Sequence, residues 1–555
     1  MNLKFVVVFL LRKTGGVSHT HQIFAKETGL TTLKQSQPSR ILCGRLAIVR
    51  PTFRLIERPL CQRKLAPPFQ QPNLTIMKRS PFRTILLLAA LISTAHAQPY
   101  FGNGMKIGET TDHSTRVWVR LTERAEPKWE GLKWIGTADR DFDVGELGEK
   151  QLPQGASLSD MEGSLMGTKG SVRISWWPEN RPKSKSQTDW LTVDPNRDYT
   201  RQVALENLEA NQRYELDIES RSTSGKSGQS LSGSFRTALG ASASEPFRFV
   251  ISTCQSWITR DKGTAGLQIY DQMLDLNPAF FAHMGDIVYY DKRSAGGDVD
   301  ALTPNLARFH WNRWYGCSDI INFHTQVPSF FIKDDHDTVT NDSVPGDQVG
   351  DLSWVRGLSI FREQVPIGHL TYRSRRWSQD LEFWFVEGRD YRSPNDLPDG
   401  PDKTIWGTEQ KAWFKEGVLA SDAPFKILFS PTPIVGPDRK NKKDNHSNEN
   451  WKHEGDEIRK FCAENNVIVI CGDRHWQFHS KDDKTGVHEF SSGASSPKHV
   501  GGFSMDLKTD EHQYLAIIAG FLSGEISKEG GQPKLTFRHH RVDGSIAYEQ
   551  TFSSK

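Results

Sequence analysis

Four short segments of this 555-residue chain carry side chains that bind hard metal ions or transfer protons. Each follows an apolar run that is typical of a buried strand. The segments are Ser252-Thr253-Cys254-Gln255, Gly285-Asp286-Ile287-Val288-Tyr289, Asp334-Asp335-His336-Asp337 and Gly472-Asp473-Arg474-His475. They meet only if their strands lie side by side in one sheet and end at one edge, where open α/β sheets bind ligands. We therefore predict a metal-dependent hydrolase with a layered α/β core.

The Gly-Asp-x-x-Tyr segment has the residues of a bridging metal site. Asp286 can bind two cations through its two oxygens, and Gly285 allows the backbone to pass close to them. Tyr289 can return to the same site three residues later. A phenolate ligand favours a hard trivalent metal such as iron, because Tyr must lose its proton. The alternative interpretation is a surface turn with a packing Tyr.

The Asp-Asp-His-Asp segment places three acids around His336. Their mutual repulsion is costly unless cations neutralise it, so we expect one carboxylate to bind metal. His336 can then stabilise or protonate a leaving oxygen. Asn341 and Asp342 follow and offer further oxygen ligands. A solvated acidic turn is the alternative.

The last segment and the first complete the ligand set. Asp473 and His475 lie on the same side of an extended piece and suit two neighbouring metals. For Arg474, which lies between them, we favour exposure to solvent, with contact to a phosphate as the alternative. Cys254 as a thiolate fits iron or zinc, whereas the alternative is a buried inert thiol.

These residues resemble the motifs of the alkaline phosphatase D (PhoD-like) family of the calcineurin-like metallophosphoesterases, in the family's order. The resemblance extends over most of the chain after residue 97. Further landmarks are the opening 104–121, Gly407-x-Glu409-Gln410-x-x-Trp413 and Ser491-Ser492-Gly493. It implies a four-layer α/β/β/α metallophosphoesterase domain preceded by an all-β Ig/fibronectin-like domain. Lys333 departs from the aromatic residue that the family usually has before Asp-Asp-His, which we expect to alter the mouth of the site.

The resemblance also implies the cofactors and the role of each residue. It implies one Fe3+ with one or two Ca2+, although some relatives use other divalent metals. The implied ligands are Cys254, Asp286, Tyr289 and His475 for iron, and Asp286, Asp335, Asp473 and Asn341 for the second metal. His336 is the implied catalytic residue, which assists departure of the alkoxide. A metal-bound hydroxide would attack phosphorus in line.

The chain after residue 97 divides into two parts by pattern. Residues 98–240 contain alternating apolar and polar runs, which predict a β-sandwich domain. Residues 245–555 alternate strands with helices, including helices expected at 265–276 and, with Thr408 as its cap, at 408–419. We expect a polar insertion at 342–400 with one strand inside it, and a solvated charged loop at 439–450.

The N-terminal region resembles a secretory leader preceded by extra sequence. Residues 77–97 have a charged start, an apolar stretch and an Ala95-His96-Ala97 cleavage pattern, which predict a signal peptide. A transmembrane anchor is the alternative, but the apolar run is short of the roughly 20 residues that a span needs. Residues 1–76 are interpreted as a mis-annotated upstream extension, with a long targeting presequence as the alternative. We expect an exported protein, periplasmic or extracellular, in a bacterium.

Composition limits the partners. Residues 1–97 hold 15 of the 70 Lys and Arg but two of the 67 acids, so the remainder is net acidic and not a nucleic-acid binder by charge. Four cysteines remain after residue 97, without the pattern of a disulfide framework. We predict a monomer that hydrolyses a small phosphoester. The alternatives are a phospholipase-type phosphodiesterase on the same site and a non-catalytic cell-wall or glycan-binding protein.

Overall fold

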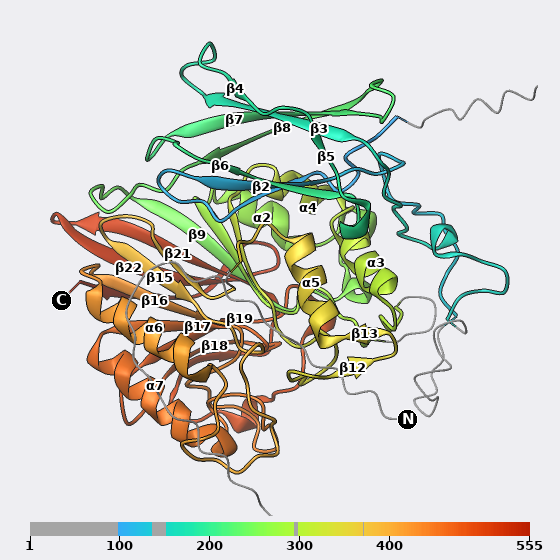
Figure 1. Ribbon diagram of the computed structural model, residues 1–555. Helices are drawn as coiled ribbons and strands as arrows, with labels where there is room; N and C mark the ends of the chain where they lie inside the picture. Colours follow the sequence, from blue (N-terminus) through green and yellow to red (C-terminus); the bar gives the residue numbers. More distant parts are fainter. Residues whose placement is uncertain (1–97, 136–150, 293–297, 370, 555) are drawn as a thin grey trace, which may run out of the picture. The chain divides into compact units, whose positions relative to one another are not determined.

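Two mixed β-sheets pack face to face at the centre of the computed structural model (Figure 1). It describes residues 98–135, 151–292, 298–369 and 371–554, which belong to one compact unit. The predicted signal peptide at 77–97 and the extension at 1–76 lie outside the described residues. Among the helices that are described, none is both long and apolar enough to cross a membrane.

The larger sheet has nine strands. In spatial order they are β23 (Ile546–Ser553), β22 (Gln532–Arg541), β21 (Gly520–Glu529), β9 (Phe247–Ser252), β10 (Phe280–Met284), β11 (Ser329–Ile332), β1 (Met105–Gly108), β2 (Thr115–Arg120) and β6 (Thr200–Leu205). The central β9, β10 and β11 are parallel, with Phe281 opposite Val250 on one side and Ser329 on the other. Their carboxyl ends therefore reach the same edge.

The second sheet has seven strands. In spatial order they are β14 (Arg373–Arg376), β15 (Leu381–Phe385), β16 (Phe425–Ser430), β17 (Val467–Cys471), β19 (His488–Ser492), β18 (Gln477–Lys481) and β20 (His512–Ala516). β15, β16, β17 and β19 run parallel, and β17 is wholly buried. A continuous apolar strand of this kind is expected where both faces of a sheet are covered.

Aromatic side chains fill the space between the sheets. Phe330 of the larger sheet stacks on Phe385 of the second, with ring centroids 5.3 Å apart, and Phe385 stacks on Phe429 at 4.7 Å. Such rings bury large apolar areas, which holds the two sheets together. The edges that carry the chemical motifs are thereby kept next to each other.

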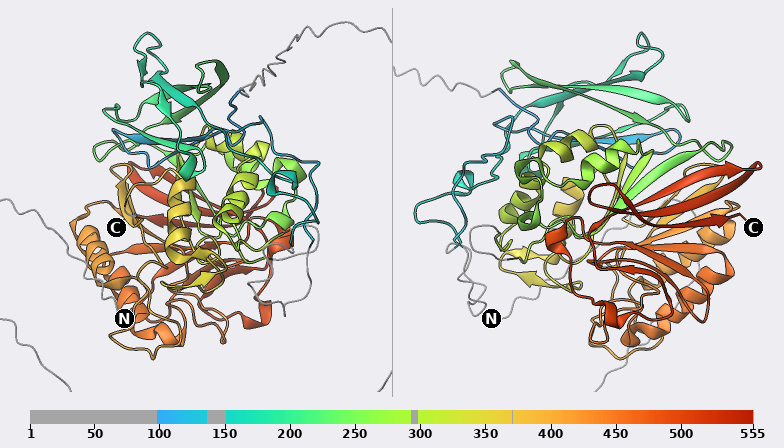
Figure 2. Two further views of the ribbon diagram at one scale, coloured as in Figure 1. Left: turned by 45° about the vertical axis from the view of Figure 1, so that its right-hand side comes forward. Right: turned by 180° about the vertical axis from the view of Figure 1, so that it is seen from behind.

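Helices cover both outer faces. α2 (Ile269–Asp275), α3 (Pro304–Trp314), α4 (Ser318–His324) and α5 (Trp354–Gln364) pack in one core with the nine-stranded sheet. α6 (Gly407–Ala420) and α7 (Lys452–Glu464) pack against the seven-stranded sheet, and are the orange helices in Figure 2. The order of layers is helices, sheet, sheet, helices.

A further sheet packs on the end of the larger one. It consists of β4 (Ser186–Gln187), β3 (Ser171–Pro178), β7 (Arg213–Arg221) and β8 (Ser227–Arg236), with β5 (Leu191–Thr192) on β3. Its apolar face shares a core with β1 and β2. Because β1, β2 and β6 also extend the nine-stranded sheet, the first strands belong to both layers. The domain boundary at 240–245 stays a prediction.

Two local predictions were wrong, and the bounds of a third differ from the prediction. Residues 342–400 are more than a polar insertion, because α5 lies within them and packs Ile360 and Phe361 into the core, next to the short hairpin β12 (Gln348–Val349) and β13 (Leu352–Ser353). Thr408 is not a cap, since α6 begins at Gly407 after Trp406 without a side-chain cap. The helix expected at 265–276 begins at Ile269, after a turn at Gly266.

Candidate metal centre

The four motifs lie at the carboxyl ends of β9, β10, β11 and β17. The expectation that these strands share one sheet was wrong, because β17 belongs to the seven-stranded sheet. The site is therefore built across the adjoining edges of two sheets. Gly472 makes this approach possible: a Cβ there would lie 2.2 Å from the carbonyl oxygen of Met284 in β10.

Three of the predicted ligands have a left-handed backbone. The φ angle is 55° at Cys254, 53° at Asp286 and 63° at Asp473. Such a conformation is uncommon for residues other than glycine and costs on the order of 1 kcal/mol or more. Backbone hydrogen bonds hold it in place, including Cys254 N to Gly285 O at 3.2 Å. Each strand thus ends in a sharp turn directly at a chemically active side chain, as strained functional sites do.

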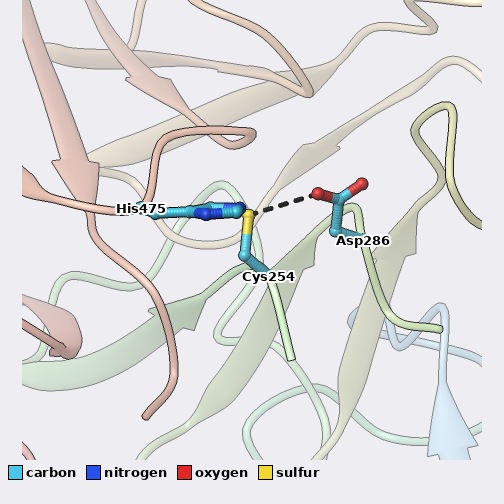
Figure 3. A group of neighbouring side chains, drawn as sticks. All are labelled: Cys254, Asp286 and His475. Carbon is cyan, nitrogen blue, oxygen red and sulfur yellow. Dashed lines mark hydrogen bonds between the residues drawn. The ribbon is translucent and has the colours of Figure 1, made fainter. Parts of the chain in front are cut away.

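One group of side chains gathers around Asp286. Cys254 Sγ donates to Asp286 Oδ2 at 3.4 Å, and the Tyr289 hydroxyl donates to the same oxygen at 2.8 Å. The Tyr289 oxygen lies 3.3 Å from Nε2 of His475. Figure 3 shows Cys254, Asp286 and His475 converging from three separate segments. Sulfur, phenol, carboxylate and imidazole form a donor set that fits iron.

A second group shares Asp286 with the first. Ligand atoms of Asp286, Asp335 and His336 lie within 4.8 Å of one another. Asp286 Oδ1 is buried and accepts no hydrogen bond from any described residue. A buried carboxylate oxygen without a partner is costly, and a cation would satisfy it. Because Oδ2 faces the first group, this arrangement fits two cations bridged by Asp286.

The protonation of these groups responds to burial. Burial raises the pKa of the Cys254 thiol, and the nearby Asp286 carboxylate raises it further. Burial likewise raises the pKa of Asp286. Burial lowers the pKa of His475, which keeps its imidazole neutral and able to bind a metal. A bound cation would lower both pKa values and favour the ionised forms that bind metals.

The other two acids of Asp-Asp-His-Asp have partners within the protein. Asp334 Oδ1 accepts from Arg389 Nε at 2.6 Å, and neither side chain is exposed. Asp337 accepts from the backbone N–H groups of Asp334 and Ile287, which ties the β10 and β11 turns together. Arg389 and the backbone donors thus relieve repulsion among the acids. Asp335 is the acid of this segment that belongs to the second group.

Lys333 does not occupy the mouth of the site as we expected. Its side chain is fully buried, with Nζ 2.5 Å from Glu387 Oε1 and 2.7 Å from Asp390 Oδ1. These two carboxylates raise the pKa of Lys333 against the opposing effect of burial. The lysine is therefore held inside the fold, and the mouth is formed by other residues.

His336 is oriented by a residue that the sequence analysis missed. Its Nδ1 lies 2.6 Å from Asp291 Oδ1, and its ring centroid lies 4.4 Å from that of Tyr289. Burial opposes protonation of His336, but Asp291, Asp335 and Asp286 raise its pKa well above the usual range. Asp291 follows Tyr289 by two residues, and that proximity was the available signal.

Arg474 is buried, so the expectation that it faces solvent was wrong. It bonds Asp438 at 2.7 Å and lies 2.7 Å from Asp473 Oδ2. The 439–450 loop is likewise not a solvated segment, because Asp444, Asn445 and His446 within it are buried. These pairs hold the loop against the Asp473 turn, where burial raises the pKa of Asp473 to about 7.

Asn341 lies at the rim and is exposed. Its backbone N–H donates to Asp291 Oδ2 at 2.7 Å. Two further rim residues were missed. His499 Nδ1 donates to the carbonyl oxygen of Cys254 at 3.0 Å, and Lys292 Nζ lies 2.7 Å from Nε2 of His499.

The four cysteines of the described residues, Cys254, Cys317, Cys462 and Cys471, are buried and unpaired with one another. Burial raises the pKa of the Cys317 and Cys462 thiols to about 12, so both are inert packing groups. Cys254 alone among them stands in a group of metal-competent side chains.

Comparison with known proteins connects this geometry to phosphatases. The pattern of the PhoD-like phosphatase family matches residues 249–543, more than half of the chain. The solved structure of PhoD aligns with a TM-score of 0.63 and 14% identity, over 83% of this chain and 91% of that one. Purple acid phosphatase PPD1 from yellow lupin (Lupinus luteus) seeds aligns with a TM-score of 0.56 and 14% identity, over 82% and 74%. At this identity both likenesses concern the fold. A search of curated proteins found no match.

Proposed function

We propose that this chain, which belongs to the PhoD-like phosphatase family and is a phosphoric ester hydrolase, is an exported alkaline phosphatase or phosphodiesterase with an Fe3+ and Ca2+ centre. The observation that carries the proposal is the shared Asp286. Its Oδ2 meets Cys254 and Tyr289, whereas its buried Oδ1 has no hydrogen-bond partner among the described residues.

The donor chemistry supports the assignment of metals. Cys254, Tyr289 and His475 offer sulfur, phenol and imidazole to iron, with Asp286 as the fourth ligand. Asp335 and Asp473 offer carboxylate oxygens, which calcium and other hard divalent ions prefer. Asn341 completes the proposed set at the exposed rim. When bound, the metals would supply an activated hydroxide and neutralise charge on the phosphoryl oxygens.

His336 is proposed as the group that assists the leaving oxygen. Asp291 fixes its Nδ1, which leaves Nε2 to donate a proton to the departing alkoxide. The neighbouring carboxylates favour the protonated form that such a donor requires. Lys292 at the rim carries a positive charge beside the first group and suits contact with a phosphoryl oxygen.

A single substitution tests this role. His336→Ala should retain its metals and fold but lose turnover of alkyl phosphates by about 100-fold or more. The loss should be smaller for nitrophenyl phosphate, because nitrophenolate leaves without a proton. Elemental analysis with kinetics on both substrates decides the matter. Joint loss of metal and activity would make His336 a ligand, and full activity on alkyl esters would make it structural.

A panel of esters and the N-terminus test the remaining parts. Turnover of phosphomonoesters, phosphodiesters and phospholipids by the metal-loaded enzyme separates phosphatase from phospholipase-type activity. For export, N-terminal sequencing of secreted protein should find a start near Gln98, after the Ala95-His96-Ala97 pattern. Secreted protein that retains residues 1–76 would contradict the proposed start and export signal.

A further inference from the structure

A second concave site lies where strands β2 and β6 meet the C-terminal end of α5 (Figure 1). Its volume is about 300 Å³, and its lining is rich in arginine: Arg116 of β2, Arg197 and Arg201 near β6, and Arg362 of α5. A cavity of this size accommodates a small ligand. None of its lining residues belongs to either group of metal-competent side chains.

The arginines of this cavity lack counter-charges. Ion pairs satisfy the neighbouring Arg120, with Asp198, and Arg308, with Glu363. By contrast, none of the ion pairs among the described residues involves any of the four cavity arginines. Like charges gathered in one concavity repel each other, and a bound anion would relieve that repulsion.

Among the described residues that line the cavity, Asp194 alone carries a carboxylate. Its Oδ1 accepts the backbone N–H of Asn196 at 2.9 Å and so caps the short helix that Pro195 begins. The carboxylate is thus engaged in local structure. The balance of charge in the cavity remains strongly positive.

Arg362 lines the cavity from the C-terminal end of α5. Its Nε is buried and has no hydrogen-bond partner among the described residues. The helix end that carries it is held in place, because Gln202 Nε2 donates to the carbonyl oxygens of Arg362 at 2.8 Å and of Val365 at 2.9 Å. The position of Arg362 at the edge of the cavity is thus fixed by the backbone of α5 and not by a counter-charge.

We propose that this cavity is a binding site for a phosphate-class oxyanion, separate from the hydrolytic centre. Guanidinium groups match tetrahedral oxyanions because their parallel N–H donors form paired, charge-assisted hydrogen bonds. Arg116 and Arg362, both half-buried, hold the anion from the sheet and from the helix. The anion is either free phosphate or one phosphate group of an extended chain. The assignment does not depend on the metals or chemistry proposed above.

The test measures binding to the metal-loaded enzyme by calorimetric titration. The probes are orthophosphate and a linear polyphosphate of about ten units. The double variant Arg116→Gln/Arg362→Gln should lose one class of sites, with affinity reduced about tenfold or more. Arg124→Gln, which removes an exposed arginine outside the cavity, is the matched control and should bind like the wild type.

A variant that is expected to bind the anion more tightly distinguishes a change in the site from a loss of structure. Asp194→Asn removes the one carboxylate of the lining while asparagine preserves the helix cap, so it should tighten binding. Turnover of nitrophenyl phosphate should stay unchanged in all these variants.

The two probes distinguish the sources of the anion. Weakened binding of both probes identifies a site for a single phosphate, whereas weakened binding of polyphosphate alone identifies a site for a phosphate chain. The proposal is overturned if the double variant binds both probes like the wild type. It is also overturned if Asp194→Asn fails to tighten binding of either probe.

Discussion

Asp291→Asn is the substitution that most directly examines how His336 is positioned. The change preserves the size of the side chain but removes the charge that faces His336 Nδ1 at 2.6 Å. A hydrogen bond to a charged group contributes about 1.5–3 kcal/mol. If His336 donates its proton in the transition state, that loss corresponds to a fall in kcat of about 10- to 100-fold.

The assay compares kcat on an alkyl phosphate and on nitrophenyl phosphate, with the metal content of each preparation measured in parallel. The fall should be larger for the alkyl ester, because its leaving group needs the proton. Thr340→Val is the matched control. It removes the longer bond of 3.3 Å to Asp291 Oδ2 and should change kcat by less than about threefold.

Two results would refute this reasoning. An unchanged kcat on the alkyl phosphate would show that the Asp291 contact does not serve catalysis. An equal fall on both substrates, with metal lost, would show that Asp291 supports the metal centre through the Asn341 backbone instead of through His336.

Two further predictions concern the metals and acid stability. Asp286→Ala should lose both metals by elemental analysis, whereas Cys254→Ala should chiefly lose iron; full retention of iron in Cys254→Ala would remove that residue from the site. Both ring nitrogens of His283 are buried without a hydrogen-bond partner in the part of the chain that the structure describes, and burial lowers its pKa to about 3. Its neutral form therefore contributes stability that is fully present above about pH 6.5 and is lost as pH falls towards 3, by about 2 kcal/mol between pH 6.5 and 5. His283→Leu should lower the pH dependence of the melting temperature in that range, and an unchanged dependence would contradict the assigned pKa.

Much of the fold follows from local pattern. The apolar runs predicted before the first and last motifs are β9 (Phe247–Ser252) and the fully buried β17 (Val467–Cys471). Such runs are readable because alternation and continuous hydrophobicity reflect burial of one face or of both. α5 was missed because it lies within a Gly- and Pro-containing polar stretch, although Trp354, Leu358 and Phe361 have helical spacing. Its buried residues pack in one core with α3 and the sheet.

The sequence by itself determined which residue types stand at the ends of the strands, because each motif is contiguous with its strand. Only the tertiary structure decided their partners. β17 comes from a second sheet, Arg389 and Arg474 neutralise Asp334 and Asp473, and Lys333 turns inward to two carboxylates. Arg389 lies 55 residues from Asp334 in the chain, and Arg474 turns inward because it pairs with Asp438, 36 residues away, as well as with its neighbour Asp473. Charge pairing in a buried site depends on distance in space, which no local pattern records.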